Sequence, residues 1–297
     1  MEKLGRFMRW GPRAYFHCDA WAREMEESVP KLIVHNFSHA EVNDCWFLTG
    51  RRFWYQTAYC AWSLERNTRR TVVLNLINDG TLEQSQVLEL RRLFPSGITV
   101  DKEDVLDRLN VHLPEKRFPY LRKKWRDYIN IRKLIDVHLG SKGPKLVLDS
   151  DMLFFSRPEE LMAWVDNPQG ICLMTDCIES YGYSRTLMES LCGASIPSLL
   201  NVGVTGLTSE LIDWDMLESW TRSLIESEGN SYYLEQALIA MLAARSEHLS
   251  VLPAKTYITF PTQRQVIDAF GVLQHYVADS KPWYFGKAWK LCLKKDI

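Results

Sequence analysis

The sequence predicts a single α/β domain with a mainly parallel central sheet flanked by helices. Short apolar runs alternate along the chain with segments of helical spacing, and this order is typical of βαβ units. The 297 residues, 46% hydrophobic and 25% charged, suit one large domain with a continuous core. We place this domain at residues 31–297. Residues 1–30 are expected to form an N-terminal arm that is irregular apart from a short helix at 20–28.

Four short apolar runs are the predicted strands, at 45–48, 71–77, 97–100 and 145–148. The segments between them space their apolar residues as helices do, and we predict helices at 53–65, 82–94 and 120–139. The first run ends in Thr49-Gly50 and the second in an Asn-Asp-Gly turn, which are breaker signals. The fourth run leads into Asp149. Ligands bind at the carboxyl ends of strands in such sheets, so this position is a candidate site.

The composition excludes several classes of protein. Lys and Arg number 36 against 37 Asp and Glu, so no long-range attraction to nucleic acid is expected. No window approaches the roughly 18 continuous apolar residues of a membrane span, and the N-terminus lacks an apolar stretch of signal-peptide length. The seven cysteines form no Cys-x-x-Cys pair and are expected to be reduced thiols. We therefore expect a cytoplasmic protein.

The C-terminal stretch at 283–295 is both basic and aromatic. It combines four aromatic residues with four lysines, namely Trp283, Tyr284, Phe285, Trp289, Lys287, Lys290, Lys294 and Lys295. This mixture is typical of a helix that lies at a membrane interface, which would make the protein peripheral to a membrane. Basic closing helices are also common in soluble proteins, so both interpretations remain open.

Asp149-Ser150-Asp151 follows directly on the strand at 145–148. Where the chain leaves the pleat of that strand, both carboxylates can converge on one cation. A hard divalent ion prefers oxygen ligands and keeps positions open for substrate phosphates. An Asp at a strand end is also common as a turn residue, so the motif gains weight only with matching partners elsewhere in the chain.

Four further features supply such partners. They are Arg132, seventeen positions before Asp149, and the segments Leu200-Asn-Val-Gly-Val-Thr-Gly-Leu207, Tyr233-Leu-Glu-Gln-Ala-Leu238 and His275-Tyr-Val-Ala-Asp-Ser-Lys-Pro-Trp283. Together with the Asp motif they resemble the retaining glycosyltransferases of the glycogenin and lipopolysaccharide galactosyltransferase type, glycosyltransferase family 8. The resemblance spans residues 120–285, and its most specific part is the His…Lys-Pro-Trp segment. It implies a GT-A fold, which is a single Rossmann-like domain.

The resemblance also implies an activity. A sugar would pass from a nucleoside diphosphate donor to a hydroxyl of a glycan, a lipid-linked or a protein acceptor, with retention of configuration. His275 would be the third metal ligand beside Asp149 and Asp151, a set that suits Mn²⁺ or Mg²⁺. The ion would neutralise the diphosphate and help it leave. Lys281 would reach the diphosphate as a point charge, and Asp149 would also contact the donor.

The remaining segments are implied to face the donor sugar. Gln236 would lie at the anomeric carbon, where a neutral amide stabilises an oxocarbenium ion without acting as a strong nucleophile. Glu235 and Arg132 would act in catalysis beside it. Asn201 would bind sugar hydroxyls, and Gly203 would let the backbone approach the sugar closely.

Three positions depart from the family pattern. The Gly of the His segment is Ala278 here, so the loop either lacks a positive φ at this point or tolerates strain. The acidic residue before Gln236 is Glu235, one methylene longer than the family's Asp. The first strand is followed by Thr49-Gly-Arg-Arg52 in place of Thr-x-Asp, which leaves the nucleobase open. UDP is implied by the resemblance alone.

Other interpretations of the same residues compete with this one. Haloacid-dehalogenase-like phosphatases also carry Asp-x-Asp after an apolar strand, so Asp149 and Asp151 fit them superficially, but their motif lies near the start of the domain. A catalytically inactive module that binds sugar nucleotides is a second alternative. The Ser-Tyr-Gly-Tyr-Ser stretch at 180–184, after Asp176, suits either an acceptor-binding loop or an ordinary connection.

Overall fold

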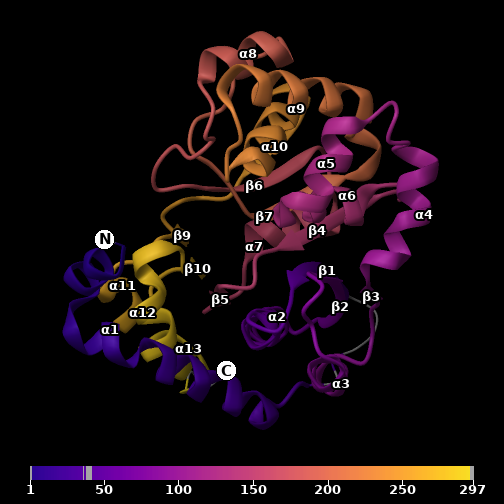
Figure 1. Ribbon diagram of the computed structural model, residues 1–297. Coiled ribbons are helices and arrows are strands. Elements are labelled where there is room, and N and C mark those ends of the chain that lie inside the picture. The colour runs from indigo at the N-terminus through magenta and orange to yellow at the C-terminus, as the bar shows by residue number, and fades with distance from the viewer. Residues whose placement is uncertain (1, 36, 38–41, 295–297) are drawn as a thin grey trace.

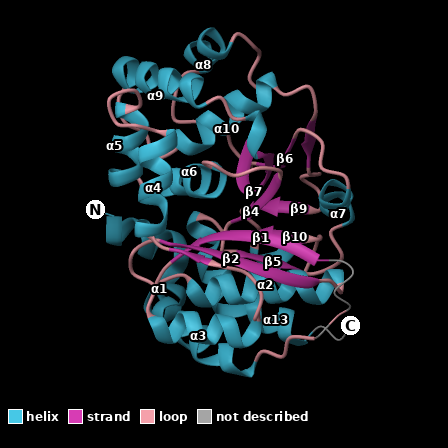
Figure 2. Ribbon diagram, turned by 90° about the vertical axis from the view of Figure 1, so that its right-hand side faces the viewer, coloured by secondary structure: helices cyan, strands magenta, loops and turns pink. Residues whose placement is uncertain are grey.

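The computed structural model describes residues 2–35, 37 and 42–294, with side chains from Phe7 onward. A seven-stranded sheet lies at its centre with helices on both faces (Figure 1, Figure 2). Its strands, in spatial order, are β3 (Thr99–Val100), β2 (Thr71–Asn78), β1 (Val42–Thr49), β4 (Pro144–Leu148), β7 (Leu200–Thr208), β6 (Ile171–Thr175) and β8 (Leu249–Val251). A second sheet contains β5 (Met152–Phe154), β10 (Leu273–His275) and β9 (Tyr257–Thr259).

The helices that cover the two sheets run along the whole chain. They are α1 (Glu2–Ser28), α2 (Trp54–Thr68), α3 (Gln84–Leu93), α4 (Lys102–His112), α5 (Pro119–Asp127), α6 (Arg132–His138), α7 (Glu159–Asp166), α8 (Arg185–Cys192), α9 (Trp214–Glu228), α10 (Leu234–Arg245), α11 (Gln263–Ile267), α12 (Lys281–Trp283) and α13 (Trp289–Lys294).

The large sheet is mainly parallel, as predicted. β1 pairs in parallel with β2 and β4, β2 with β3, and β6 with β8. Only β7 runs antiparallel among the described strands of this sheet, between β4 and β6. All four predicted strands are present as β1, β2, β3 and β4. The predicted α/β class is therefore confirmed.

Both faces of the large sheet are buried, which explains why its strands are nearly continuous apolar runs. In β4, Leu146 and Leu148 belong to one hydrophobic cluster and Val147 to the other. Side chains alternate between faces along a strand, so each face receives its own core. The first cluster includes buried residues of α2 and the small sheet, and the second includes those of α6 and α10.

The small sheet determines where the chain goes after β4. Three residues separate the end of β4 at Leu148 from the start of β5 at Met152, and β10 runs antiparallel beside β5 with His275 opposite Met152. The backbone N–H of Tyr276 donates to the carbonyl of Asp151 at 2.9 Å. This pairing brings a late segment of the chain to the carboxyl end of β4.

The predicted helix at 120–139 is interrupted in the structure. α5 ends at Asp127, Tyr128 is extended with φ −133° and ψ 99°, and a 3-10 turn at Ile129–Ile131 precedes α6. The Tyr128 hydroxyl donates to the carbonyl of Tyr232 at 2.6 Å, which fixes the break against the loop before α10. Side chains of α6 therefore point in directions that a continuous helix would not give.

The N-terminal arm is far more helical than predicted. α1 extends over Glu2–Ser28 with a kink at Gly11, whose φ of 74° and ψ of 163° are not helical. Pro12 follows, and proline suits the first turn of a new helix segment. The Gly-Pro pair thus divides the arm into two helical segments. None of the described helices is long and apolar enough to cross a membrane.

The aromatic residues of the C-terminal stretch face inward. Tyr284 and Trp289 are buried, and Trp283 and Phe285 pack against the same core. This stretch, which contains α12, a π-helical turn at Tyr284–Ala288 and α13, lies against α1 (Figure 1). Lys295 lies outside the described residues. The aromatic residues that suggested a membrane-facing helix therefore serve to close the core.

Candidate functional site

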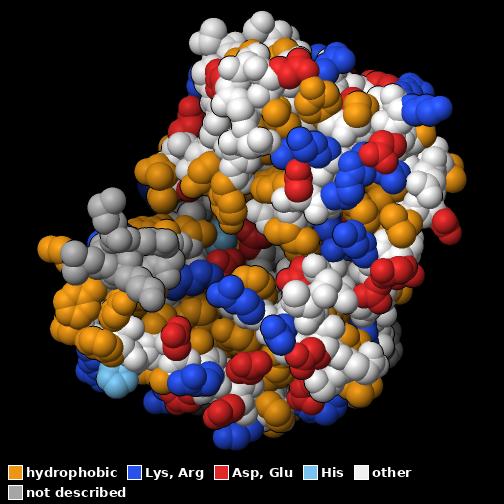
Figure 3. All heavy atoms as spheres, in the orientation of Figure 1, with side chains coloured by type: hydrophobic (Ala, Val, Ile, Leu, Met, Phe, Trp, Pro, Cys, Tyr) orange, Lys and Arg blue, Asp and Glu red, His pale blue; other side chains and the backbone are white. Residues whose placement is uncertain are grey.

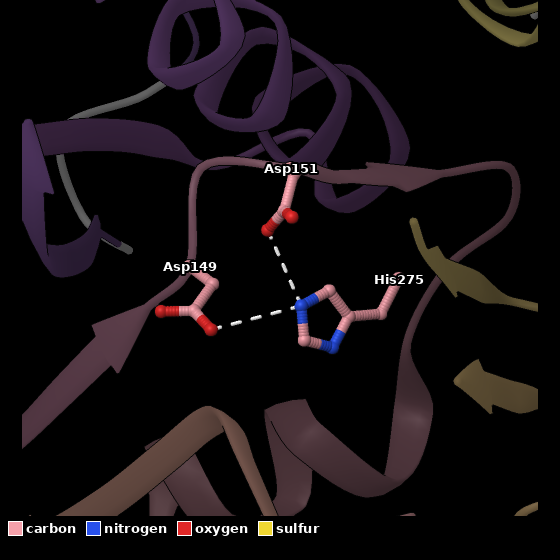
Figure 4. A group of neighbouring side chains, drawn as sticks. All are labelled: Asp149, Asp151 and His275. Atoms are coloured by element: carbon pink, nitrogen blue, oxygen red, sulfur yellow. Dashed lines mark ion pairs between the residues drawn. The ribbon is translucent and has the colours of Figure 1, made fainter. Parts of the chain in front are cut away.

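Asp149, Asp151 and His275 meet at the carboxyl edge of the large sheet (Figure 4). His275 Nε2 lies 3.2 Å from Asp151 Oδ1 and 3.6 Å from Asp149 Oδ2. One ligand atom from each of the three residues lies within 4.8 Å of the others. The prediction from the sequence that these three side chains lie close together is confirmed.

These three ligand atoms fit a single divalent ion. Adjacent ligands of an octahedral ion at about 2.1 Å lie about 3 Å apart, close to the distances between His275 Nε2 and the two carboxylates. Two carboxylate oxygens and one imidazole nitrogen suit a hard or borderline ion such as Mg²⁺ or Mn²⁺. The backbone holds both acids in place, because Asp149 N–H donates to the carbonyl of Gly203 at 2.8 Å and the Asp151 carbonyl accepts from Tyr276.

Gly203 provides the space for the imidazole. A Cβ at this position would lie 2.5 Å from His275 Cε1 and 2.6 Å from Nδ1, closer than real contacts allow. The φ of Gly203 is not positive, so glycine is required here for close approach rather than for backbone conformation. The close approach implied for a donor sugar is made in the structure by a metal-ligand candidate.

Two lysines neutralise the acidic residues of the cluster. Lys281 Nζ lies 2.5 Å from Asp151 Oδ2. Lys133 Nζ lies 3.0 Å from Asp149 Oδ1 and 3.1 Å from Glu235 Oε2. Burial opposes ionisation of Asp151, but Lys281 and His275 outweigh it and hold its pKa well below the ordinary range.

Burial and neighbouring charges shift the pKa of both Glu235 and His275. Burial raises the pKa of Glu235 to about 7, against the opposing effect of Lys133. Burial disfavours a charged His275, yet the carboxylates of Asp151 and Asp149 prevail and raise the imidazole pKa. Without an ion the imidazole therefore tends to be protonated and to take the place of a cation between the two acids.

A hydrogen-bonded group of polar side chains continues from the cluster. Asp176 Oδ2 accepts from Asn201 Nδ2 at 3.1 Å and from Gln236 Nε2 at 3.3 Å. Gln236 Nε2 also donates to the carbonyl of Leu200 at 2.9 Å. Asn201 and Gln236 are thus brought together as predicted, and Asp176 is the acid that holds them.

These residues line one cleft of about 800 Å³. Its walls include all the predicted site residues except Arg132, namely Asp149, Asp151, Asn201, Gly203, Glu235, Gln236, His275 and Lys281. Figure 3 shows it as a hollow with acidic side chains and a histidine at its base, and hydrophobic side chains along its upper rim. A smaller cavity of about 210 Å³ adjoins the cluster at the ends of β1, β2 and β4.

Arg132 does not reach this cleft. Its side chain is 2% exposed, and its guanidinium donates to Asp136 Oδ2 and to the carbonyl of Asn78, each at 2.6 Å. Lys133, the next residue, lines the cleft instead. The break at Tyr128 turns α6 so that Lys133 faces the site, and the seventeen-residue spacing could not reveal this rotation.

The stretch at 180–184 supports the cleft from behind. The Tyr181 hydroxyl donates to the carbonyl of Pro197 and accepts from Leu200 N–H, and Tyr183 bonds to the carbonyl of Gly229. Both tyrosines are buried. The residues that line the cleft from this part of the chain are Asp176, Cys177, Ile178 and Ser180.

The loop between His275 and Lys281 is tied to the N-terminal helix. Trp10 Nε1 donates to Asp279 Oδ1 at 2.9 Å, and Arg9 pairs with Asp279 Oδ2 at 2.6 Å. Ala278 adopts a φ of 44°, so the loop keeps the positive φ of a glycine and tolerates the strain. Contacts from α1 and pairing of β10 thus hold this loop from both sides.

Gly203→Ala should move the His275 ring and weaken Mn²⁺ binding at least about tenfold while the fold persists, as measured by titration calorimetry and circular dichroism. Gly206→Ala is a matched control on the same strand, because its Cβ would meet the Trp164 ring at 2.7 Å, away from the cluster. An unchanged Mn²⁺ affinity in folded Gly203→Ala would contradict the claim that Gly203 provides the space for the His275 ring.

Ala278→Gly should stabilise the protein by up to about 1 kcal/mol, because relief of the left-handed conformation exceeds the added entropy of the unfolded chain. Chemical unfolding measures the change. Ala163→Gly, at an exposed position inside α7, serves as the control and should cost about 1 kcal/mol. Equal destabilisation by both substitutions would show that the loop carries no strain.

No family model matches the sequence, and no curated protein sequence matches it. Solved structures do match. Mouse xyloside xylosyltransferase 1 superposes with a TM-score of 0.55 at 15% identity, over 80% of this chain and 99% of that one. The galactosyltransferase LgtC, in complex with donor and acceptor sugar analogues, gives 0.54 at 13% identity over 85% and 96%.

The bifunctional glycosyltransferase WbbM is also similar, with a TM-score of 0.50 at 10% identity over 89% of this chain and 53% of that one. At such identities the likeness concerns the fold. The chain therefore adopts the GT-A fold, and the resemblance to glycosyltransferases of the lipopolysaccharide galactosyltransferase type that its motifs indicate extends to its three-dimensional structure.

Proposed function

We propose that this protein transfers a sugar from a nucleoside diphosphate donor to a hydroxyl acceptor, with a divalent ion at Asp149, Asp151 and His275. The observation that carries the proposal is the convergence of these three side chains at the edge of a GT-A sheet. Similarity of the fold to structures titled as glycosyltransferases supports it.

The smaller cavity suits the nucleoside. Its lining residues come from the ends of β1, β2 and β4, from the start of α2 and from the segment before α6, and they include Thr49, Phe53, Gln56, Asp79 and Asn130. Asp149, Asp151 and Lys281 line both cavities, so a diphosphate at the cluster would connect a nucleoside in one with a sugar in the other. UDP is the donor nucleotide that the resemblance favours.

The cluster suits the charge of a diphosphate. The bound ion would supply Lewis-acid assistance, because it neutralises negative charge that grows as the diphosphate leaves. Lys281, one quarter exposed, can exchange Asp151 for a phosphate oxygen once an ion occupies the acids. Lys133 pairs with both Asp149 and Glu235 and offsets their negative charge at the base of the cleft.

The sugar end suits a reaction with retention. Gln236 uses its amide nitrogen for Asp176 and Leu200, which leaves the amide oxygen for positive charge at the anomeric carbon. The acceptor oxygen bonds to the anomeric carbon on the face that the diphosphate leaves. The carbon–oxygen bond to the β-phosphate breaks with its electron pair, and the hydroxyl proton passes to the departing diphosphate.

The two alternatives are less well supported. A phosphatase of the haloacid-dehalogenase type would need Asp149 as a free nucleophile, whereas Lys133 and His275 both contact it. An inactive binding module would have no need of three converging ligands with two lysines beside them. Release of inorganic phosphate from simple esters would favour the phosphatase. Donor binding without turnover would favour the inactive module.

Asp151→Ala and His275→Ala should each lower Mn²⁺-dependent release of nucleoside diphosphate from the active nucleotide sugar at least about a hundredfold, because second and third ligands fix the ion. Release is followed with a panel of donors, and circular dichroism checks the fold. Asp268→Ala, an exposed acid outside the cleft, is the control and should retain full release. Turnover at the wild-type rate in both variants would refute the assignment.

Binding of Mn²⁺ should release protons and weaken at low pH. The raised pKa of His275 means that the imidazole binds a proton below that pKa, and metal coordination requires the neutral form. Affinity is therefore full above the raised pKa and falls by up to about tenfold per pH unit below it.

Titration calorimetry in buffers of different ionisation enthalpy counts the protons released by metal binding. His275→Gln, which offers an amide that does not titrate, should abolish the proton release attributed to this residue. A binding enthalpy that is independent of the buffer near the raised pKa of wild-type His275 would contradict the linkage.

A further inference from the structure

The cleft is lined by exposed apolar and aromatic side chains as well as by the charged residues of its metal end. Three of its lining side chains are apolar or aromatic and yet exposed to solvent, with Ile178 at 66%, Tyr233 at 41% and Phe260 at 39%. None of the three lines the smaller cavity. Figure 3 shows hydrophobic side chains along the upper rim of the cleft.

Phe260 is held in an unfavourable conformation at this rim. Its φ is 60°, a genuine outlier for a bulky side chain, and it precedes Pro261, which restricts it further. The conformation persists because Phe260 follows β9 directly and its N–H donates to the carbonyl of His275 at 3.0 Å. Strain of this kind gathers at functional sites, where the surrounding structure fixes it.

The charges of the cleft indicate what can bind against Phe260. Among the described residues that line it, the basic side chains are Lys133, Lys281 and His275, and all three are paired with acids of the metal end. Beyond Asp149, Asp151 and Glu235 of the metal end, the remaining acid among these lining residues is Asp176. A carboxylated or phosphorylated acceptor would meet this acid with no cation to pair with it, whereas hydroxyl groups could donate to it.

We propose that Phe260, with Ile178 and Tyr233, forms an acceptor subsite for an uncharged sugar whose apolar ring face stacks on the aromatic ring. The proposal rests on the proposed transferase function and names its acceptor class. A pyranose presents C–H groups on one face and hydroxyl groups at its edge, so it can cover Phe260 while its edge reaches Asp176. The reactive hydroxyl then approaches the anomeric carbon beside Gln236.

The test compares acceptors and variants with a donor that the wild-type protein hydrolyses. Methyl glycosides of neutral sugars are matched with methyl glycosides of the corresponding uronic acids. Phe260→Ala should raise the KM for the neutral acceptor about threefold to tenfold, with a smaller change in the donor KM. Phe260→Tyr and Phe260→Trp should restore the acceptor KM, and Phe270→Ala, an exposed aromatic outside the cleft lining, should leave it unchanged.

Three outcomes overturn the subsite while the transferase function stands. They are a preference for the uronic acid glycosides, an acceptor KM that Phe260→Ala leaves within twofold of wild type, and an equal effect of Phe270→Ala. Circular dichroism checks that Phe260→Ala is folded. If it is not, Phe260→Tyr is compared with the wild-type protein and should keep the wild-type acceptor KM.

Failure of the proposed function has a separate signature. If no nucleotide sugar is hydrolysed with Mn²⁺ or Mg²⁺, saturation-transfer NMR still measures whether neutral methyl glycosides contact the protein. Contact that Phe260→Ala removes and Phe270→Ala retains supports the subsite, and absence of contact in the wild-type protein overturns it.

Discussion

The pairing of β5 with β10 is the interaction on which the site depends. β5 starts just after Asp151 and β10 ends at His275, so their register fixes the distance between an acid and an imidazole far apart in the chain. The Tyr276 N–H bond to the Asp151 carbonyl closes the pair at the point of the cluster. Because side chains alternate along a strand, a slip of one residue would turn His275 away from both acids.

Charge balance explains how the acidic side chains at the base of the cleft can lie together. Asp149, Asp151 and Glu235 are gathered in a largely buried place, which costs free energy unless cations accompany them. Lys133 and Lys281 provide two positive charges, and a protonated imidazole or a bound ion provides the remainder. The arrangement tolerates exchange of one cation for another, which a site that binds and releases a metal–diphosphate complex requires.

The sequence was sufficient to predict the parts that depend on local pattern. The strand at 145–148 and its Asp motif follow from an apolar run and its end, and His275 was recognised because Lys281-Pro-Trp283 stands beside it. The structure confirms the α/β class and the meeting of Asp149, Asp151 and His275. The divalent ion at these residues and the nucleoside diphosphate donor are the subject of the proposal above.

The features that the sequence did not reveal depend on tertiary contacts. Lys133 replaces Arg132 at the cleft because the Tyr128 hydroxyl binds the loop before α10 and breaks a helix that looks continuous. α1 is longer than predicted, because the Gly11-Pro12 pair interrupts the helical pattern and a further helical segment precedes it. Phe260 could not be found from any motif, since its exposure and positive φ arise only from the folding of β9 against β10.

Pulsed electron paramagnetic resonance of bound Mn²⁺ tests the central claim most directly. One ion held by Asp149, Asp151 and His275 should show hyperfine coupling to a single imidazole nitrogen, which ¹⁵N-histidine labelling changes and His275→Gln removes. A Mn²⁺ spectrum with no nitrogen coupling in the wild-type protein, at occupancy confirmed by titration, would contradict the account.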